Sequence, residues 1–198
     1  MKPNTHRPLA GLFTLVVTAA STMSLAAPPK PAALPLVLYS DAGHPEPFTP
    51  SGYMGNIGTV KMDESWTAGP HSGKTCLQVS YTATSRWGGV AWQNPANNWG
   101  DKPGGLNLSG AKKLTFWARG AKGGEVVSFA YGLIGPDKPV HDSGKGKLDK
   151  VTLTKAWKQY SIPVVGQNLT HIVTGFSWSL AAAGTPVTFY LDDIAFTR

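Results

Sequence analysis

The sequence of 198 residues has little cysteine, little charge and no sustained helical pattern. Its single cysteine, Cys76, cannot form an internal disulfide, so the fold must depend on its core or on a bound ion. Charged residues make up 15% of the chain and hydrophobic residues 41%, a balance that excludes a disordered chain or a coiled coil. No 3.6-residue period continues beyond two helical turns, which argues against long helices.

Glycine, proline and aromatic residues are plentiful by contrast. The chain has 23 Gly, 16 Pro and 7 Trp, a composition that favours strands separated by frequent turns. Short runs rich in apolar residues predict strands at 36–39, 74–81, 89–93, 113–119, 125–131, 151–154, 158–164, 172–180 and 187–196. Strands at this spacing predict one all-β domain, a sandwich or a barrel, over residues 36–198. Cys76 alternates with apolar residues, so we expect a buried, inert thiol.

The last predicted strand changes its pattern at a pair of acids. Its apolar residues are at odd-numbered positions before Asp192 and at even-numbered positions after Asp193, so their parity along the strand changes. Such a change indicates a β-bulge, which redirects side chains. Burying an uncompensated carboxylate costs several kcal/mol. We therefore expect at least one of the two acids to have a cation or hydrogen-bond donors beside it.

Residues 1–26 have the layout of a secretory signal peptide. Lys2 and Arg7 precede an apolar run that ends in small residues at Ala26. We therefore expect a secreted, periplasmic or extracellular protein with no membrane insertion after cleavage. Residues 27–35 have the composition of a stiff Pro/Ala-rich linker.

Several other kinds of site are disfavoured. Ala68–Thr75 has the spacing of a phosphate-binding loop, but a strand pattern follows where that loop requires a helix. The net charge of +7 is dispersed, with Lys112–Lys113 as the only adjacent basic pair, so nucleic acid is not an expected partner. The histidines and the lone cysteine show no zinc-ligand spacing.

Catalytic side chains are available, but no motif selects among them. A glycoside hydrolase needs two carboxylates that face each other across a cleft. The candidates are Asp63, Glu64, Asp142 and Asp192 for a hydrolase, and Tyr131, His141 and Arg119 for a polysaccharide lyase.

The tryptophans are the most informative residues. Several lie in polar, glycine-rich segments such as 85–89 and 91–100. Trp117 has the parity opposite to Leu114 and shares its strand face with Arg119. A sugar ring packs its C–H groups on an aromatic face, while its hydroxyls need amide, carboxylate or guanidinium partners. The tryptophans indicate either a glycan-binding surface or the second half of a sandwich core.

Four short motifs lie along the chain at Ser72–Lys74, Leu114–Gly120, Trp157–Tyr160 and Phe189–Ile194. Together they resemble jelly-roll carbohydrate-binding modules with the galactose-binding-domain-like fold. The resemblance implies a β-sandwich jelly roll of two antiparallel sheets that binds glycan on a concave sheet face or at the loop edge. It also implies a structural calcium ion, with Asp41, the turn from His71 to Lys74, and Asp192 as the matching ligands.

We therefore predict a non-catalytic, monomeric protein that binds an oligosaccharide or polysaccharide through an aromatic platform. The expected stacking rings are Trp92, Trp117, Tyr131 and Trp178, and the expected hydrogen-bonding partners are Arg119, Gln93 and Asn98. Two alternatives stay open, a small glycan-active lyase or hydrolase on the same fold and a structural envelope or matrix protein.

Overall fold

The structure is a computed structural model that describes residue 1, residues 29–44 and residues 46–198. From residue 2 onward, the predicted signal peptide lies outside the described residues. The described part contains eleven strands and one short 3-10 turn, η1 (Ile57–Thr59). None of its helical segments is long and apolar enough to cross a bilayer. The all-β prediction is confirmed.

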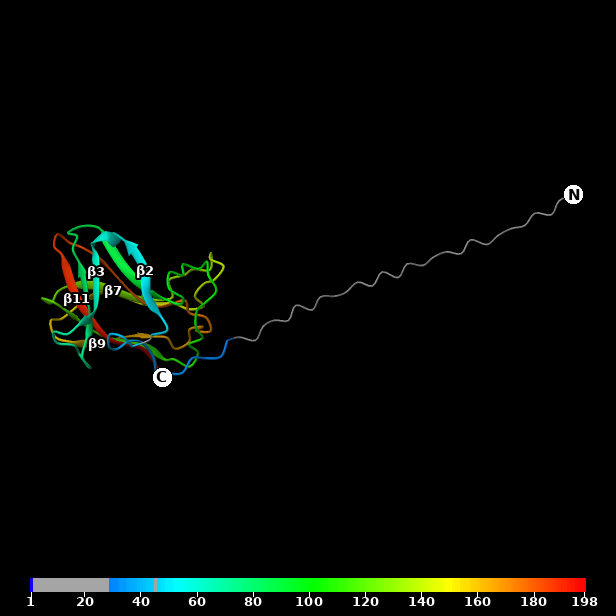
Figure 1. Cartoon of the computed structure of the whole chain (residues 1–198), viewed down its shortest axis with the longest axis horizontal. Coiled ribbons are helices and arrows are strands. Elements are labelled where there is room, and N and C mark those ends of the chain that lie inside the picture. Colours follow the sequence, from blue (N-terminus) through cyan, green and yellow to red (C-terminus); the bar gives the residue numbers. More distant parts are fainter. Residues whose placement is uncertain (2–28, 45) are drawn as a thin grey trace.

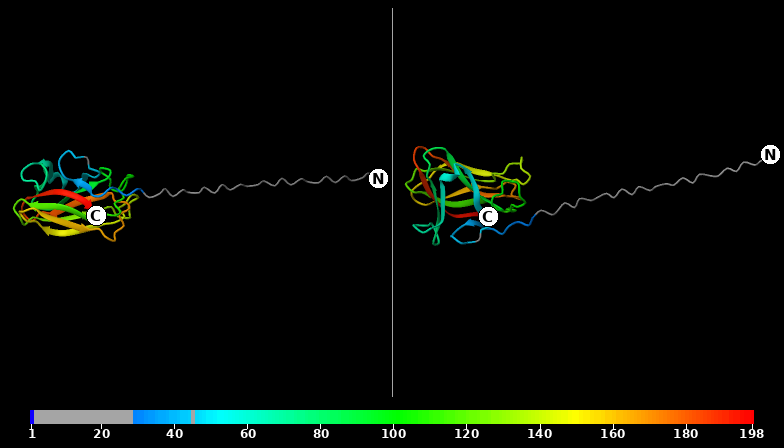
Figure 2. Two further views of the ribbon diagram at one scale, coloured as in Figure 1. Left: turned by 90° about the horizontal axis from the view of Figure 1, so that it is seen from below. Right: turned by 45° about the horizontal axis from the view of Figure 1, so that its top comes forward.

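One sheet contains six strands. Along its path lie β3 (Val60–Trp66), β4 (Cys76–Tyr81), β11 (Val187–Thr197), β6 (Lys113–Gly120) and β9 (Lys158–Pro163). The first strand, β1 (Leu36–Tyr39), pairs with the end of β11, whose beginning pairs with β4. In Figure 2 the red ribbon of β11 lies within this layer.

The second sheet contains five strands. They follow the order β2 (Thr49–Gly55), β5 (Trp87–Gln93), β10 (Thr174–Ala181), β7 (Val126–Tyr131) and β8 (Gly146–Thr152). Neighbouring strands are antiparallel in both sheets. The sheets pack face to face, which confirms the predicted β-sandwich jelly roll (Figure 1).

Aromatic rings from both sheets meet in the core. Phe116 of β6 contacts Phe129 of β7 and Phe176 of β10, with ring centroids 4.6 and 5.2 Å apart. Such ring pairs each contribute about 0.5–1.5 kcal/mol beyond the area they bury. Cys76 is fully buried, and burial raises the pKa of its thiol to about 11, as expected for an inert cysteine.

The bulge predicted in the last strand is present. Asp192 lies opposite Trp117 and Ala195 opposite Thr115, so β11 has one extra residue between these two pairs. Asp193 occupies the left-handed region with φ of +49°. The bulge brings both acids to the loop between β3 and β4.

The sequence pattern misses two strands and misplaces a third. Neither β2 nor β3 is predicted, and β8 begins at Gly146 instead of Val151. All three lie at sheet edges. An edge strand has one neighbour and tolerates proline and charge, such as Pro50 in β2 or Asp63 in β3, which obscure the apolar pattern.

Residues 29–35, which the composition assigns to a stiff linker, contact the folded domain. The Ala32 N–H donates to the Asn107 carbonyl at 2.8 Å, and the Asn107 side chain donates to the Pro29 carbonyl at 2.6 Å. Ala32 and Leu34 pack against the hydrophobic core. This segment is therefore part of the folded domain.

Candidate functional site

Three of the four predicted stacking rings lie in the core. Trp92 and Tyr131 are each 1% exposed, and Trp178 is fully buried. Trp92 packs edge-on against Phe176 and Trp178 against Phe189, with ring centroids 5.3 Å apart in both pairs. A ring without an exposed face cannot stack on a sugar. The predicted platform is wrong at these three positions, where the alternative of a sandwich core is correct.

Two of the predicted hydrogen-bonding partners are internal as well. Gln93 and Asn98 are fully buried. The Gln93 side chain donates to the Asn98 carbonyl at 2.8 Å, and Asn98 Oδ1 accepts the Gly100 N–H at 3.0 Å. Because these contacts hold the loop after β5, the prediction of ligand contacts is wrong for both amides.

Trp117 and Arg119 lie on the outer face of the β3–β4–β11–β6–β9 sheet, as their parity predicts. The His71 ring stacks on Trp117 with ring centroids 3.7 Å apart and an interplanar angle of 17°. The Arg119 guanidinium lies 3.8 Å from the Tyr190 ring centroid and donates to the Ala68 carbonyl at 3.2 Å. Both side chains thus hold the β3–β4 loop on the sheet, and one face of the Trp117 ring is already covered.

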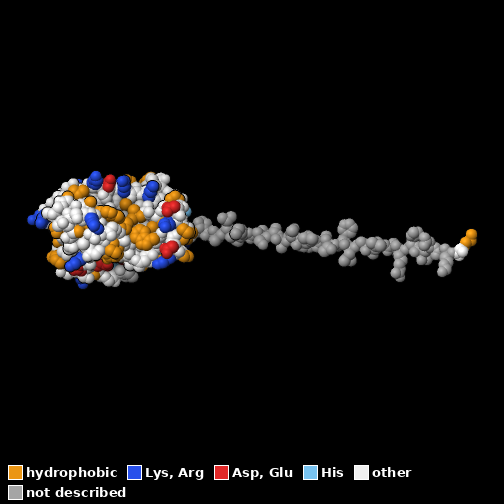
Figure 3. Space-filling model, turned by 90° about the horizontal axis from the view of Figure 1, so that it is seen from above, with side chains coloured by type: hydrophobic (Ala, Val, Ile, Leu, Met, Phe, Trp, Pro, Cys, Tyr) orange, Lys and Arg blue, Asp and Glu red, His pale blue; other side chains and the backbone are white. Residues whose placement is uncertain are grey.

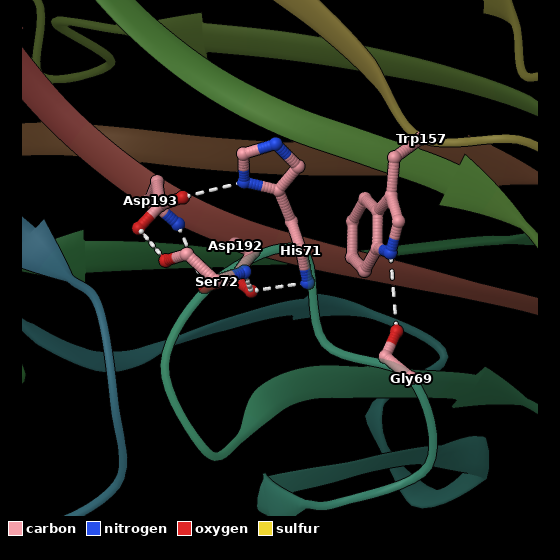
Figure 4. Close-up of polar contacts among 6 residues, drawn as sticks. All are labelled: Gly69, His71, Ser72, Trp157, Asp192 and Asp193. Atoms are coloured by element: carbon pink, nitrogen blue, oxygen red, sulfur yellow. Dashed lines mark hydrogen bonds and ion pairs between the residues drawn. The ribbon is translucent and has the colours of Figure 1, made fainter.

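The same loop is tied to the acids of the bulge (Figure 4). The backbone N–H groups of His71 and Ser72 donate to Asp192 Oδ2 at 2.9 and 3.3 Å. The Ser72 hydroxyl donates to Asp193 at 2.8 Å, and His71 Nδ1 lies 2.8 Å from the same carboxylate. The expectation of hydrogen-bond donors is confirmed. Burial, with the charge of Asp193 beside it, nevertheless raises the pKa of Asp192 to about 6.

Asp41, the other matching calcium ligand, lies against the end of the same turn. Its Oδ1 accepts the N–H groups of Lys74 and Thr75, both at 2.8 Å, which lowers the pKa of this carboxyl below its usual value. Gly73 has φ of +58°, and a Cβ there would collide with this carboxylate. The turn thus presents N–H donors to both acids.

A calcium ion takes carboxylate, carbonyl and water oxygens as ligands. Both Asp41 and Asp192 already use lone pairs on the N–H groups of the turn. Within residues 29–44 and 46–198, no three His, Cys, Asp or Glu side chains gather to hold a metal. Calcium binding stays a prediction.

The outer face of the β2–β5–β10–β7–β8 sheet is hollowed. Two adjoining hollows, of about 480 and 290 Å³, share Trp87, Ser128 and Ser179 in their lining. Small residues form the floor of these hollows. At Gly89 there is no room for a side chain, because a Cβ there would lie 2.5 Å from the Trp178 carbonyl oxygen. We call this surface the groove.

Larger side chains form the sides of the groove. Trp87, at the start of β5, is 50% exposed, and Met54 lies near it on β2. The opposite side is formed by the edge strand β8, with Lys147, Asp149 and Lys150. Figure 3 shows a face on which hydrophobic side chains gather in the middle, and Lys or Arg side chains with acidic side chains among them follow the upper edge.

A third hollow, of about 500 Å³, continues the groove. It shares Leu133 with the second hollow and is lined further on by Lys145, Gln167 and Asn168. The groove therefore follows β7 from its first residue to the loops beyond its last, with an indole ring in its first part and amide groups in its last.

Trp87 is the residue that the sequence prediction leaves out of the platform. Along β5 it has the parity opposite to Val90 and Trp92, both of which are buried. Along β10, Trp178 alternates with Ser177 and Ser179, which face outward. Strand parity is the signal that separates the exposed ring from the buried ones.

A separate small pocket contains two glutamates. Glu46 and Glu64 line a space of about 170 Å³ beside β1, and burial raises the pKa of both carboxyls. Glu46 lies 3.1 Å from His44. This pocket shares no lining residue with the groove.

The comparisons concern the whole domain. A family model described as carbohydrate binding domain 30 matches residues 41–198. A comparison with curated proteins gives no match.

Two carbohydrate-binding modules are among the solved structures similar to this chain. One is the family 30 carbohydrate-binding module of the cellulosomal cellulase Cel9D-Cel44B of Clostridium thermocellum, at 17% identity and a TM-score of 0.57, covering 84% of this chain and 98% of that one. The other is the family 11 module from Clostridium thermocellum in complex with a β-1,3-1,4-mixed-linked tetrasaccharide, at 16% identity and a TM-score of 0.52, covering 84% and 97%. At these identities the likeness shows the fold.

Proposed function

Because the chain belongs to the carbohydrate binding domain 30 family, we propose that it binds a polysaccharide, without catalysis, in the groove. The observation that carries this proposal is the half-exposed ring of Trp87 beside a floor of serines. An indole face accepts the C–H face of a pyranose, and the Ser128 and Ser179 hydroxyls can exchange hydrogen bonds with sugar hydroxyls.

The length of the groove supports a chain-like ligand. Three adjoining hollows offer room for several sugar units in a row. The similar family 11 module was solved with a mixed-linked tetrasaccharide, and the similar family 30 module belongs to a cellulase. A linear β-glucan is therefore the first ligand to test.

The proposed site of action is outside the cytoplasm. The signal-peptide pattern of residues 1–26 supports export, and insoluble or high-molecular-mass polysaccharides are met there. Purified exported protein that begins at Ala27 would support this part of the proposal, and a retained residue 1 would contradict it.

Substitution of Trp87 tests the groove directly. Trp87→Ala should weaken binding to a β-glucan oligosaccharide about ten-fold, since a stacking ring contributes about 0.5–1.5 kcal/mol beyond its buried area. Titration calorimetry measures the affinity, and the melting temperature shows whether the variant is folded.

Trp117→Ala is the matched control, because Trp117 lies on the other sheet. It should leave the affinity unchanged. Wild-type affinity in Trp87→Ala would contradict the proposal, and a loss only in Trp117→Ala would move the site to the other sheet. Release of reducing ends or unsaturated products from the glucan would instead favour the enzyme alternative.

A further inference from the structure

The β8 side of the groove carries an excess of positive charge. Lys145, Lys147 and Lys150 are exposed, and one of them lines each of the three hollows. Asp149 lies 3.5 Å from Lys147 Nζ and accepts the Ser128 hydroxyl at 2.8 Å. In the described chain, neither Lys145 nor Lys150 forms an ion pair within 4 Å.

A β-bulge turns Lys150 toward the groove. Val127 lies opposite Val151 and Phe129 opposite Leu148, so β8 has an extra residue between these pairs. In a regular strand, residue 150 would share the inward parity of Leu148. Lys150 instead takes φ of +49°, a conformation that is unfavourable for a residue with a Cβ, and its N–H donates to Ser128 at 3.0 Å. The bulge thus places a lysine where a regular strand would not.

Asp142 lines the third hollow with Lys145 but forms no ion pair with it in the described chain. Asp142 accepts the N–H groups of Ile134, Val173 and Thr174 at 2.8, 2.6 and 2.9 Å. Burial raises the pKa of its carboxyl. Its oxygens accept backbone N–H groups and not the Lys145 ammonium, so this ammonium can pair with a ligand.

We propose that the groove selects an acidic polysaccharide, whose carboxylates pair with Lys145 and Lys150 while a sugar ring stacks on Trp87. This inference rests on the proposed function, since it requires a glycan in the groove. Exposed Lys–carboxylate pairs are individually weak and are screened by salt. The preference for acidic chains should therefore be largest at low ionic strength.

Two cellulose derivatives test the charge preference of the full chain. Carboxymethyl cellulose and hydroxyethyl cellulose share a β-1,4-glucan backbone, and only the first carries carboxylates. We expect tighter binding of carboxymethyl cellulose at low salt. The difference should disappear in about 1 M NaCl, where the Debye length is about 3 Å.

The double variant Lys145→Gln, Lys150→Gln tests the residues. It should lower the affinity for carboxymethyl cellulose about two- to five-fold per lysine and leave binding to hydroxyethyl cellulose unchanged. The matched control is Lys112→Gln, Lys113→Gln, which removes the same charge from exposed positions at the start of β6 in the other sheet. The control should bind both polymers as the wild type does.

The outcomes separate the two proposals. Equal affinity for both polymers at low salt would overturn the acidic preference and leave the proposed function standing. An equal loss in the control variant would also overturn it, because attraction by net charge would explain the result. No binding of either polymer or of the β-glucan oligosaccharide would overturn both.

Discussion

Trp87 lies open to solvent because the residues around it on the outer sheet face are small. Gly89 follows two positions later with the same parity, and Ser179 of the neighbouring strand β10 and Ser128 of β7 line the same hollow as the ring. Trp92 belongs to the same strand but has the opposite parity and packs in the core. Within one strand, therefore, one indole is placed for ligand binding and the other for stability.

Asp192 should make stability depend on pH. Its pKa is about 6 in the folded protein, above the ordinary value of 3.8, so between these two pH values the folded state holds a proton that the unfolded state has released. The contribution of Asp192 to the free energy of unfolding should rise by about 1–2 kcal/mol as the pH falls from about 7 to about 4.

Denaturant unfolding of the wild type and of Asp192→Asn measures this effect. The asparagine keeps a side-chain oxygen that can accept the N–H groups of His71 and Ser72, but it carries no titratable group. The advantage of the wild type over the variant should increase as the pH is lowered. A difference that is constant or shrinks toward low pH would contradict the prediction.

Parity predicts the direction of a side chain but not what covers it. The alternation of β6 correctly places Trp117 on an outer face, because Leu114 and Phe116 face the core. The His71 ring stacks on Trp117 because the β3–β4 loop, which is far from Trp117 in the sequence, passes over it. The Asp192–Asp193 bulge holds this loop in place. Local pattern contains no information on such a contact, so the sequence prediction assigns Trp117 to a ligand.

At the scale of elements, the inner strands are the predictable ones. β10 and β11 have neighbours on both sides, and their apolar alternation is strong. The edge strands β2, β3 and β8 bury less, so charge, proline and a bulge interrupt the pattern. Two of these edge strands, β2 and β8, border the groove. The sequence pattern therefore does not predict which polar side chains of these strands face it.

Replacement of Lys150 by glycine should show that the bulge is strained. Glycine adopts positive φ without a Cβ penalty, so Lys150→Gly should raise the free energy of unfolding by about 0.5–1 kcal/mol. Lys147→Gly, on the same strand without a positive φ, should lower it by a similar amount, about 0.5–1 kcal/mol. Thermal or denaturant unfolding checks both, and destabilisation by Lys150→Gly would contradict the argument.

At the scale of the whole molecule, one core between two sheets holds the domain together. The buried rings come from both sheets, and the chain has no pair of cysteines to bridge them. The turn at residues 71–75 is fixed by N–H donors to Asp41 and Asp192. These hydrogen bonds link the turn to β11 and to the residues after β1.

Chelation tests that account against the calcium prediction. The melting temperature of the domain should be the same in EDTA and in calcium-containing buffer, as the turn geometry requires no ion. A fall in EDTA that added calcium restores would show an ion bound to the folded state. It would then establish the calcium site that the family resemblance implies.

The exposure of Trp87 gives the molecule an optical reporter of its own. Trp87 is 50% exposed and Trp99 38%, whereas Trp92 and Trp178 are shielded from water. A bound sugar would replace water at the Trp87 indole, shift its fluorescence emission to shorter wavelength and protect it from collisional quenchers. Occupancy of the groove can thus be followed in unlabelled protein.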